Sequence, residues 1–124
     1  MAASPEHFAG LMMWRLTVRH GSEVKRRTLD SLEEAIAEME RRAEAIRAEG
    51  PLDEVTMFRS YGPERRVAAR LELTGPGRIR RPEAGLDVMG DGRLVPYRGT
   101  LFKRELEPER GESAYEAVRA AVSG

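Results

Sequence analysis

Residues 12–19 show the clearest alternation of apolar and polar positions in this chain. One side of the alternation contains Met12, Trp14, Leu16 and Val18. The other side contains Met13, Arg15, Thr17 and Arg19. Because successive side chains of a strand point to opposite faces, this pattern predicts a half-buried strand. The residues 20–22 predict a tight turn into a second strand, 24–28, whose weak pattern is typical of a sheet edge.

A helical period follows over residues 31–48. Its apolar residues recur at steps of four and three, at Leu32, Ile36, Met39, Ala43 and Ile46. Ser31 and Glu34 fit a capping box, in which hydroxyl and carboxylate accept hydrogen bonds from free backbone N–H groups. Gly50–Pro51 would end the helix. The apolar stripe is under three heptads long, so packing on a sheet is favoured over a coiled coil.

Two further hairpins are predicted in the second half of the chain. Alternation over 55–60 and 65–73 predicts one of them, with a proline-containing turn between its strands. Segments 86–89 and 94–104 predict the other, around a Gly-Asp-Gly turn. Between the hairpins, 74–85 is rich in Gly, Pro and Arg and predicts a turn-rich connection.

The last of these strands has apolar residues on both faces. One parity contains Val95, Tyr97 and Leu101. The other parity contains Leu94 and Phe102. Pro96 and Gly99 indicate an edge or a bulge. If Tyr97 and Leu101 face the core, the opposite side needs a cover, which either a C-terminal helix or a second subunit could provide.

Taken together, these elements predict a single α+β domain in the order ββαββββα. Ser113 and Glu116 repeat the capping-box pattern and predict a short C-terminal helix. We expect an antiparallel sheet with this helix and the long one packed on one face. Residues 11–124 would form the domain and residues 1–10 a flexible tail. A chain of 124 residues is long enough for one continuous core.

The composition narrows the chemistry. The chain has no Asn, Gln or Cys, and Lys25 and Lys103 are its only lysines. Without cysteine there is no disulfide framework and no thiolate metal site, and we expect neither a metal nor a cofactor. The bias is thermophile-like, because thermolabile residues are depleted and ion pairs multiply in such proteins. The chain shows no signal peptide and no apolar run of membrane-spanning length, which predicts a cytoplasmic protein without membrane contact.

Charge is uneven although the formal net charge is zero. Residues 55–104 carry eleven basic and five acidic side chains, whereas 31–54 carry three and eight. Arginine binds carboxylate and phosphate in a bidentate manner, and tyrosines beside it can stack on bases. The sequence therefore predicts one contiguous cationic surface that binds an anionic ligand or a partner. Its proposed members are Arg66, Arg70, Arg80, Arg81, Arg98, Tyr61 and Tyr97. Pairing of these arginines with nearby carboxylates would neutralise that surface.

Catalytic motifs are weak. His20, Ser22 and Asp30 could suggest a hydrolytic triad, but two of them fall in one turn without an oxyanion hole. Residues 87–92 lack the acidic spacing of a calcium loop and are better explained as a hairpin turn. We therefore assign no catalytic residue.

These observations favour a small non-enzymatic cytoplasmic domain for binding or assembly, which we expect to be a homodimer. An acidic protein is a further candidate partner. Nucleic-acid or phosphate binding through arginine-rich strands is the alternative, although a pI of about 6.8 is low for that class. An enzyme that uses tyrosine, arginine and carboxylates is the least favoured reading.

Overall fold

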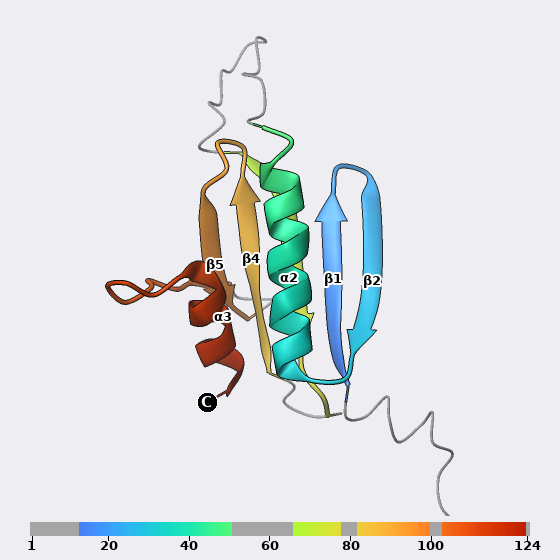
Figure 1. Ribbon diagram of the computed structural model, residues 1–124. Coiled ribbons are helices and arrows are strands. Elements are labelled where there is room, and N and C mark those ends of the chain that lie inside the picture. Colours follow the sequence, from blue (N-terminus) through green and yellow to red (C-terminus); the bar gives the residue numbers. More distant parts are fainter. Residues whose placement is uncertain (1–12, 51–65, 78–81, 100–102, 124) are drawn as a thin grey trace, which may run out of the picture.

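The computed structural model describes residues 13–50, 66–77, 82–99 and 103–123 (Figure 1). Several sequence predictions fall outside these ranges. They are the tail 1–10, the strand 55–60, and the residues Tyr61, Arg80, Arg81, Leu101 and Phe102.

The described residues form one antiparallel sheet of six strands and two helices. The strands are β1 (Trp14–His20), β2 (Glu23–Leu29), β3 (Val67–Thr74), β4 (Glu83–Met89), β5 (Leu94–Arg98) and β6 (Arg104–Glu105). The helices are α2 (Leu32–Arg47) and α3 (Ala114–Ser123). This is the predicted α+β order ββαββββα.

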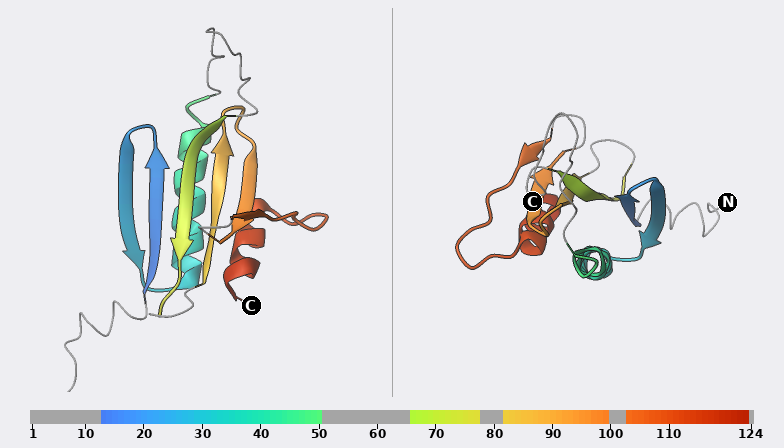
Figure 2. Two further views of the ribbon diagram at one scale, coloured as in Figure 1. Left: turned by 180° about the vertical axis from the view of Figure 1, so that it is seen from behind. Right: turned by 90° about the horizontal axis from the view of Figure 1, so that it is seen from above.

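The spatial order of the strands is β2-β1-β3-β4-β5-β6. β1 and β2 form a hairpin, after which α2 passes over the sheet and the chain returns in β3 on the other side of β1. Strands β3 to β6 then follow one another across the sheet. Both helices lie on the same face of the sheet, as the view from above shows (Figure 2). Neither of the two described helices lies on the opposite face.

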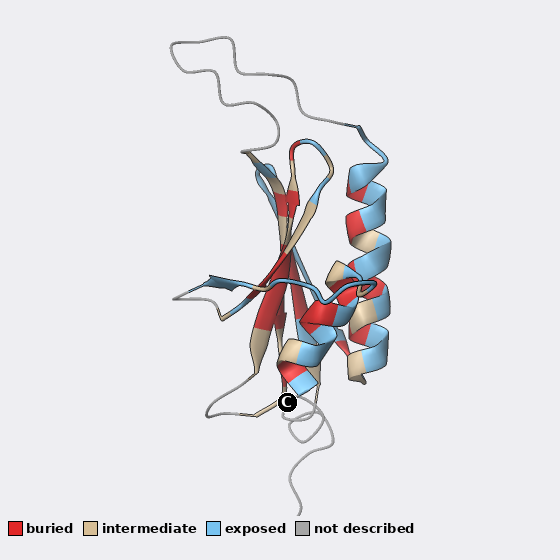
Figure 3. Ribbon diagram, turned by 90° about the vertical axis from the view of Figure 1, so that its left-hand side faces the viewer, coloured by how far each residue is buried: buried red, intermediate tan, exposed pale blue. Residues whose placement is uncertain are grey.

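The core lies between the sheet and the helices (Figure 3). Alternate residues of β1, β3 and β4 point into it, and the antiparallel register aligns them in rows: Leu16 with Leu73, and Val18 with Leu71 and Leu86. Met39 of α2 and Val118 of α3 are fully buried against them. Each such side chain stabilises the fold by about 1.5–3 kcal/mol when it leaves water.

The helix predictions are confirmed at their starts. Ser31 caps α2, since its hydroxyl accepts a hydrogen bond from the Glu34 backbone N–H at 3.1 Å. The Glu34 carboxylate in turn accepts the N–H of Asp30, one residue earlier than in the ideal box. α2 ends at Arg47, and Gly50 follows with φ of 92°. The predicted stop at this glycine is therefore correct.

Two predictions in the second half need correction. β4 begins at Glu83, so the end of the supposed turn-rich connection belongs to a strand. The supposed strand 94–104 is interrupted after Arg98, because Gly99 adopts φ of 83° and turns the chain toward the short β6. The turn at Gly90–Asp91–Gly92 is as predicted, and Gly92 donates its N–H to the carbonyl of Met89 at 2.9 Å.

Candidate binding surface

The sheet face without helices is the candidate site, and we call it the open face. Its residues follow from the register, because they alternate with the buried ones along each strand. Figure 2 shows the molecule from this side (left view). The open face contains Arg15, Thr17, Arg19, Val24, Arg26, Thr28, Arg70, Glu72, Thr74, Glu83, Gly85, Asp87, Val95 and Tyr97.

Two arginines near the centre of the open face are neutralised by cross-strand carboxylates. Arg70 binds Asp87 with two parallel contacts, from Nε to Oδ1 at 2.7 Å and from Nη2 to Oδ2 at 2.9 Å. This hydrogen bonding raises the pKa of Arg70 above its ordinary value. Arg19 Nε lies 3.1 Å from Glu72 Oε1. These pairs leave little net charge over β3 and β4.

Arg15 and Arg26 differ from them, and we call these two residues the open-face arginine pair. Both side chains are exposed. Arg15 lies opposite Thr28 and Thr74 in the sheet, and Arg26 lies opposite Thr17. Within the described ranges, neither guanidinium has a carboxylate partner. The β1–β2 half of the open face therefore keeps its positive charge.

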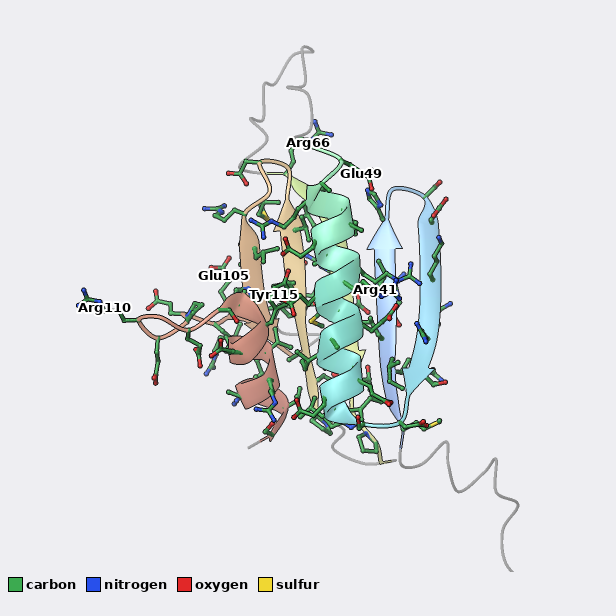
Figure 4. All side chains as sticks on the ribbon, viewed as in Figure 1. Arg41, Glu49, Arg66, Glu105, Arg110 and Tyr115 are labelled. Carbon is green, nitrogen blue, oxygen red and sulfur yellow. The ribbon has the colours of Figure 1, made fainter. Side chains whose placement is uncertain are left out.

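The structure brings together only some of the arginines that the sequence grouped. Arg70 lies on the open face but is paired, as described above. Arg98 lies opposite the buried Ala84 in the strand register, so its side chain is on the helix side of the sheet. There its Nη2 donates a hydrogen bond to the Ala121 carbonyl at 3.3 Å. Arg66 stands just before β3, at one end of the sheet (Figure 4). Arg66 and Arg70 line one depression together with Arg19, whereas Arg98 lies apart from them on the helix side.

Tyr97 also lies on the open face, but it is only 2% exposed. The ring crosses its strand partner Gly85, where an added Cβ would stand 2.2 Å from the phenolic oxygen. Lys103 Nζ is 5.0 Å from the ring centroid and the Arg70 guanidinium carbon is 5.8 Å from it. Burial raises the pKa of the hydroxyl well above its ordinary range. Arg70 and Tyr97, which the sequence grouped, do lie close together, but Tyr97 is buried and offers no free ring.

On the helix side, one carboxylate joins β2 to α2. Glu38 is 7% exposed and accepts hydrogen bonds from Arg27 of β2 at 2.9 Å and from Arg42 at 2.9 Å. Arg41 Nη2 lies 2.5 Å from both carboxylate oxygens. Hydrogen bonding from Arg41 is the largest cause that lowers the pKa of Glu38 to about 2. We call this group of four residues the Glu38 latch.

Two depressions lie between β2 and α2, where the Glu38 latch joins them. The larger has a volume of about 450 Å³ and includes Leu29 and Glu34 in its wall. The smaller, about 220 Å³, is lined in part by Val18, Ala45 and Ile46 and is rimmed by charged side chains. Sequence reasoning did not find these depressions, because they depend on how α2 lies over the hairpin.

The described residues also show where the groups considered for metal binding and hydrolysis lie. No group of three or more His, Asp or Glu side chains among them could hold a metal ion. His20 Nε2 lies 3.9 Å from Glu49 Oε1, beyond the end of α2, and not in a triad.

The open-face arginine pair could have been found from sequence. The alternation over 12–19 already placed Arg15 on the outer side of its strand. Arg26 was harder to assign, because the edge strand has no clear pattern.

Comparisons of the chain with protein-family models, with curated proteins and with solved structures found no match. In the parts of the chain that the structure describes, no helix has the length and apolar character needed to cross a bilayer.

Proposed function

We propose that this protein is a non-enzymatic cytoplasmic binding domain whose open-face arginine pair contacts an acidic protein. One observation carries the proposal: Arg15 and Arg26 are exposed cations on a sheet face that neither described helix covers, and no described carboxylate neutralises them. The absence of cysteine is compatible with a reducing compartment.

The chemistry of this surface suits carboxylates. A guanidinium presents several N–H donors in one plane, which match the two oxygens of a carboxylate. The threonines that lie opposite the arginine pair add hydroxyl groups at the same level of the sheet. Since Arg19 and Arg70 are already paired with carboxylates, the unpaired arginines of the described open face are Arg15 on β1 and Arg26 on β2.

Nucleic acid fits the same surface less well. Proteins that bind single strands combine cations with aromatic rings on which bases stack. Among the residues that the structure places on the open face, Tyr97 is the aromatic one, and it is 2% exposed. A base could not reach this ring without displacing the residues that cover it.

Charge reversal of the pair tests the proposal. The double variant Arg15→Glu/Arg26→Glu should bind a fluorescent polyglutamate peptide at least about ten-fold more weakly than the parent protein, because attraction becomes repulsion. The fold should persist, since both side chains are exposed. Fluorescence anisotropy at increasing salt concentration measures the affinity and its screening.

The matched control is Arg104→Glu/Arg110→Glu, which changes the net charge equally at exposed positions away from β1 and β2 (Figure 4 labels Arg110). This control should retain most of the affinity. Equal losses in both double variants would show unspecific charge attraction and contradict the proposal. Tighter binding of oligouridylate than of polyglutamate, with a steep dependence on salt, would assign the surface to nucleic acid instead.

A further inference from the structure

Among the described residues, no strand pairs with the outer edge of β2. β2 is the first strand in the spatial order, and six of its seven residues are exposed. His20 and Glu23 flank a two-residue turn and pair with each other, so they exchange the first hydrogen bonds of the ladder. The ladder alternates from there, which directs the N–H and C=O groups of Val24, Arg26 and Thr28 away from β1.

The two sides of this edge differ in character. On the open face, Arg26 and its diagonal neighbour Arg15 carry positive charge that is not paired. On the helix side, Arg27 is held by Glu38, and Lys25 Nζ lies 3.6 Å from Glu23. The smaller depression also lies on the helix side, next to β2, and its lining mixes Val18, Ala45 and Ile46 with charged residues. An added strand would therefore meet cations on one face and a partly apolar recess on the other.

A second copy of β2 fits this edge poorly at full overlap. In a symmetric antiparallel pair with full overlap, Arg26 would lie opposite Arg26 of the other copy, and Lys25 opposite Arg27. Like charges directly opposite each other destabilise a strand pair. Charged residues on edge strands are also a common protection against self-association.

We propose that β2 accepts an extended acidic segment of a partner protein as an additional strand. The inference rests on the proposed function, and it specifies how the acidic partner is held. Hydrogen bonds from the partner's backbone satisfy Val24, Arg26 and Thr28, as in other cases of strand addition. Acidic side chains of the segment face the open-face arginine pair, and the alternate apolar side chains face the smaller depression.

Amide hydrogen exchange measured by NMR tests this geometry directly. The probe is a peptide of alternating glutamate and valine. On its addition, the amides of Val24, Arg26 and Thr28 should become protected by about ten-fold or more, because each gains a hydrogen bond. The amides of Lys25 and Arg27 already face β1 and should change little.

Proline substitutions provide a second test. Val24→Pro removes one outward N–H without changing charge, and edge strands tolerate proline at such positions. Peptide binding should weaken roughly five-fold relative to Val24→Ala, as expected for one lost hydrogen bond. Thr28→Pro and Thr28→Ala form an equivalent pair on the same edge, should one proline variant fold poorly.

The outcomes separate the two proposals. If Arg15→Glu/Arg26→Glu weakens peptide binding but the three amides stay unprotected, the acidic partner is retained and strand addition is overturned. If the peptide does not bind even at low salt, both proposals fail. Protection of the same amides without peptide, in a protein that sediments as a dimer, would show that a second copy occupies the edge and would also overturn the inference.

Discussion

At the scale of single residues, Gly85 shows how one missing side chain permits the packing of the open face. Its strand partner Tyr97 lies across it, and an added Cβ would stand 2.2 Å from the phenolic oxygen and 2.6 Å from the Leu71 carbonyl oxygen. The backbone oxygen cannot move aside cheaply. We therefore predict that Gly85→Ala lowers the free energy of unfolding by about 3 kcal/mol, at the upper end for overpacking.

Urea unfolding followed by circular dichroism measures this loss. The same substitution in a Tyr97→Ala background should cost less, because the ring is then absent and the two changes are not additive. An equal cost in both backgrounds would show that the ring does not cause the strain. In the sequence, Gly85 ends the stretch 74–85 that predicted a turn-rich connection. Its contact with Tyr97 could not be predicted, because it joins residues on two different strands.

At the scale of elements, α3 is tied to α2 by two contacts between side chains, one from Arg119 to Glu33 and one from Tyr115 to Glu44. Tyr115 Oη lies 2.5 Å from Glu44 Oε2, and Tyr115 points from α3 toward α2 (Figure 4). Burial raises the pKa of Tyr115, and the hydrogen bond from Tyr115 is the largest cause that lowers the pKa of Glu44. Tyr115→Phe should therefore destabilise the protein by about 1 kcal/mol, the usual net value of one hydrogen bond.

Thermal unfolding monitored by calorimetry checks this value. Ser113→Ala serves as a comparison on the same helix, because it removes the cap hydroxyl that accepts the Glu116 N–H at 3.1 Å and leaves the contact between the helices intact. Combined with Glu44→Ala, Tyr115→Phe should add little further loss. Full additivity of those two substitutions would contradict a direct bond between them.

Elements with local signals could be predicted from sequence, whereas those that depend on distant partners could not. α2 has its cap and its apolar stripe within one segment, so both its start and its stop were predicted. The face of Tyr97 was ambiguous, because β5 has apolar residues on both parities and only the register with β4 decides between them. The interruption after Arg98 likewise depends on the backbone conformation of Gly99.

At the scale of the whole molecule, the arrangement of charge departs from the expected segregation of basic strands and acidic helices. The Glu38 latch brings two arginines of α2 and one of β2 around a single helix carboxylate. The apolar period of residues 31–48 did not predict this cluster, because Glu38 lies beside the apolar stripe and was expected at the surface. The arginines over 55–104 were expected to form the cationic surface, but the unpaired cations of the open face lie on β1 and β2.

The Glu38 latch should also govern how the stability of the molecule depends on pH. The pKa of Glu38 is about 2 in the folded protein, against 4.5 as its ordinary value in an unfolded chain. Because the pKa of Glu38 is lower in the folded state than in the unfolded state, ionised Glu38 stabilises the folded protein fully above about pH 4.5. This stabilisation is lost as the pH falls toward about 2. We expect it to be roughly 2 kcal/mol, because two of the three arginines are more than half exposed to solvent.

Urea unfolding of the parent protein, Glu38→Gln and Glu40→Gln over this pH range provides the measurement. Glu38→Gln cannot ionise, so its deficit relative to the parent should be largest above about pH 4.5 and should shrink toward about pH 2. Glu40 is exposed on the same helix, and Glu40→Gln should follow the parent throughout. If Glu38→Gln lowers the free energy of unfolding by the same amount at every pH, the Glu38 latch acts through packing alone. The charge of Glu38 would then not couple β2 to the helix layer.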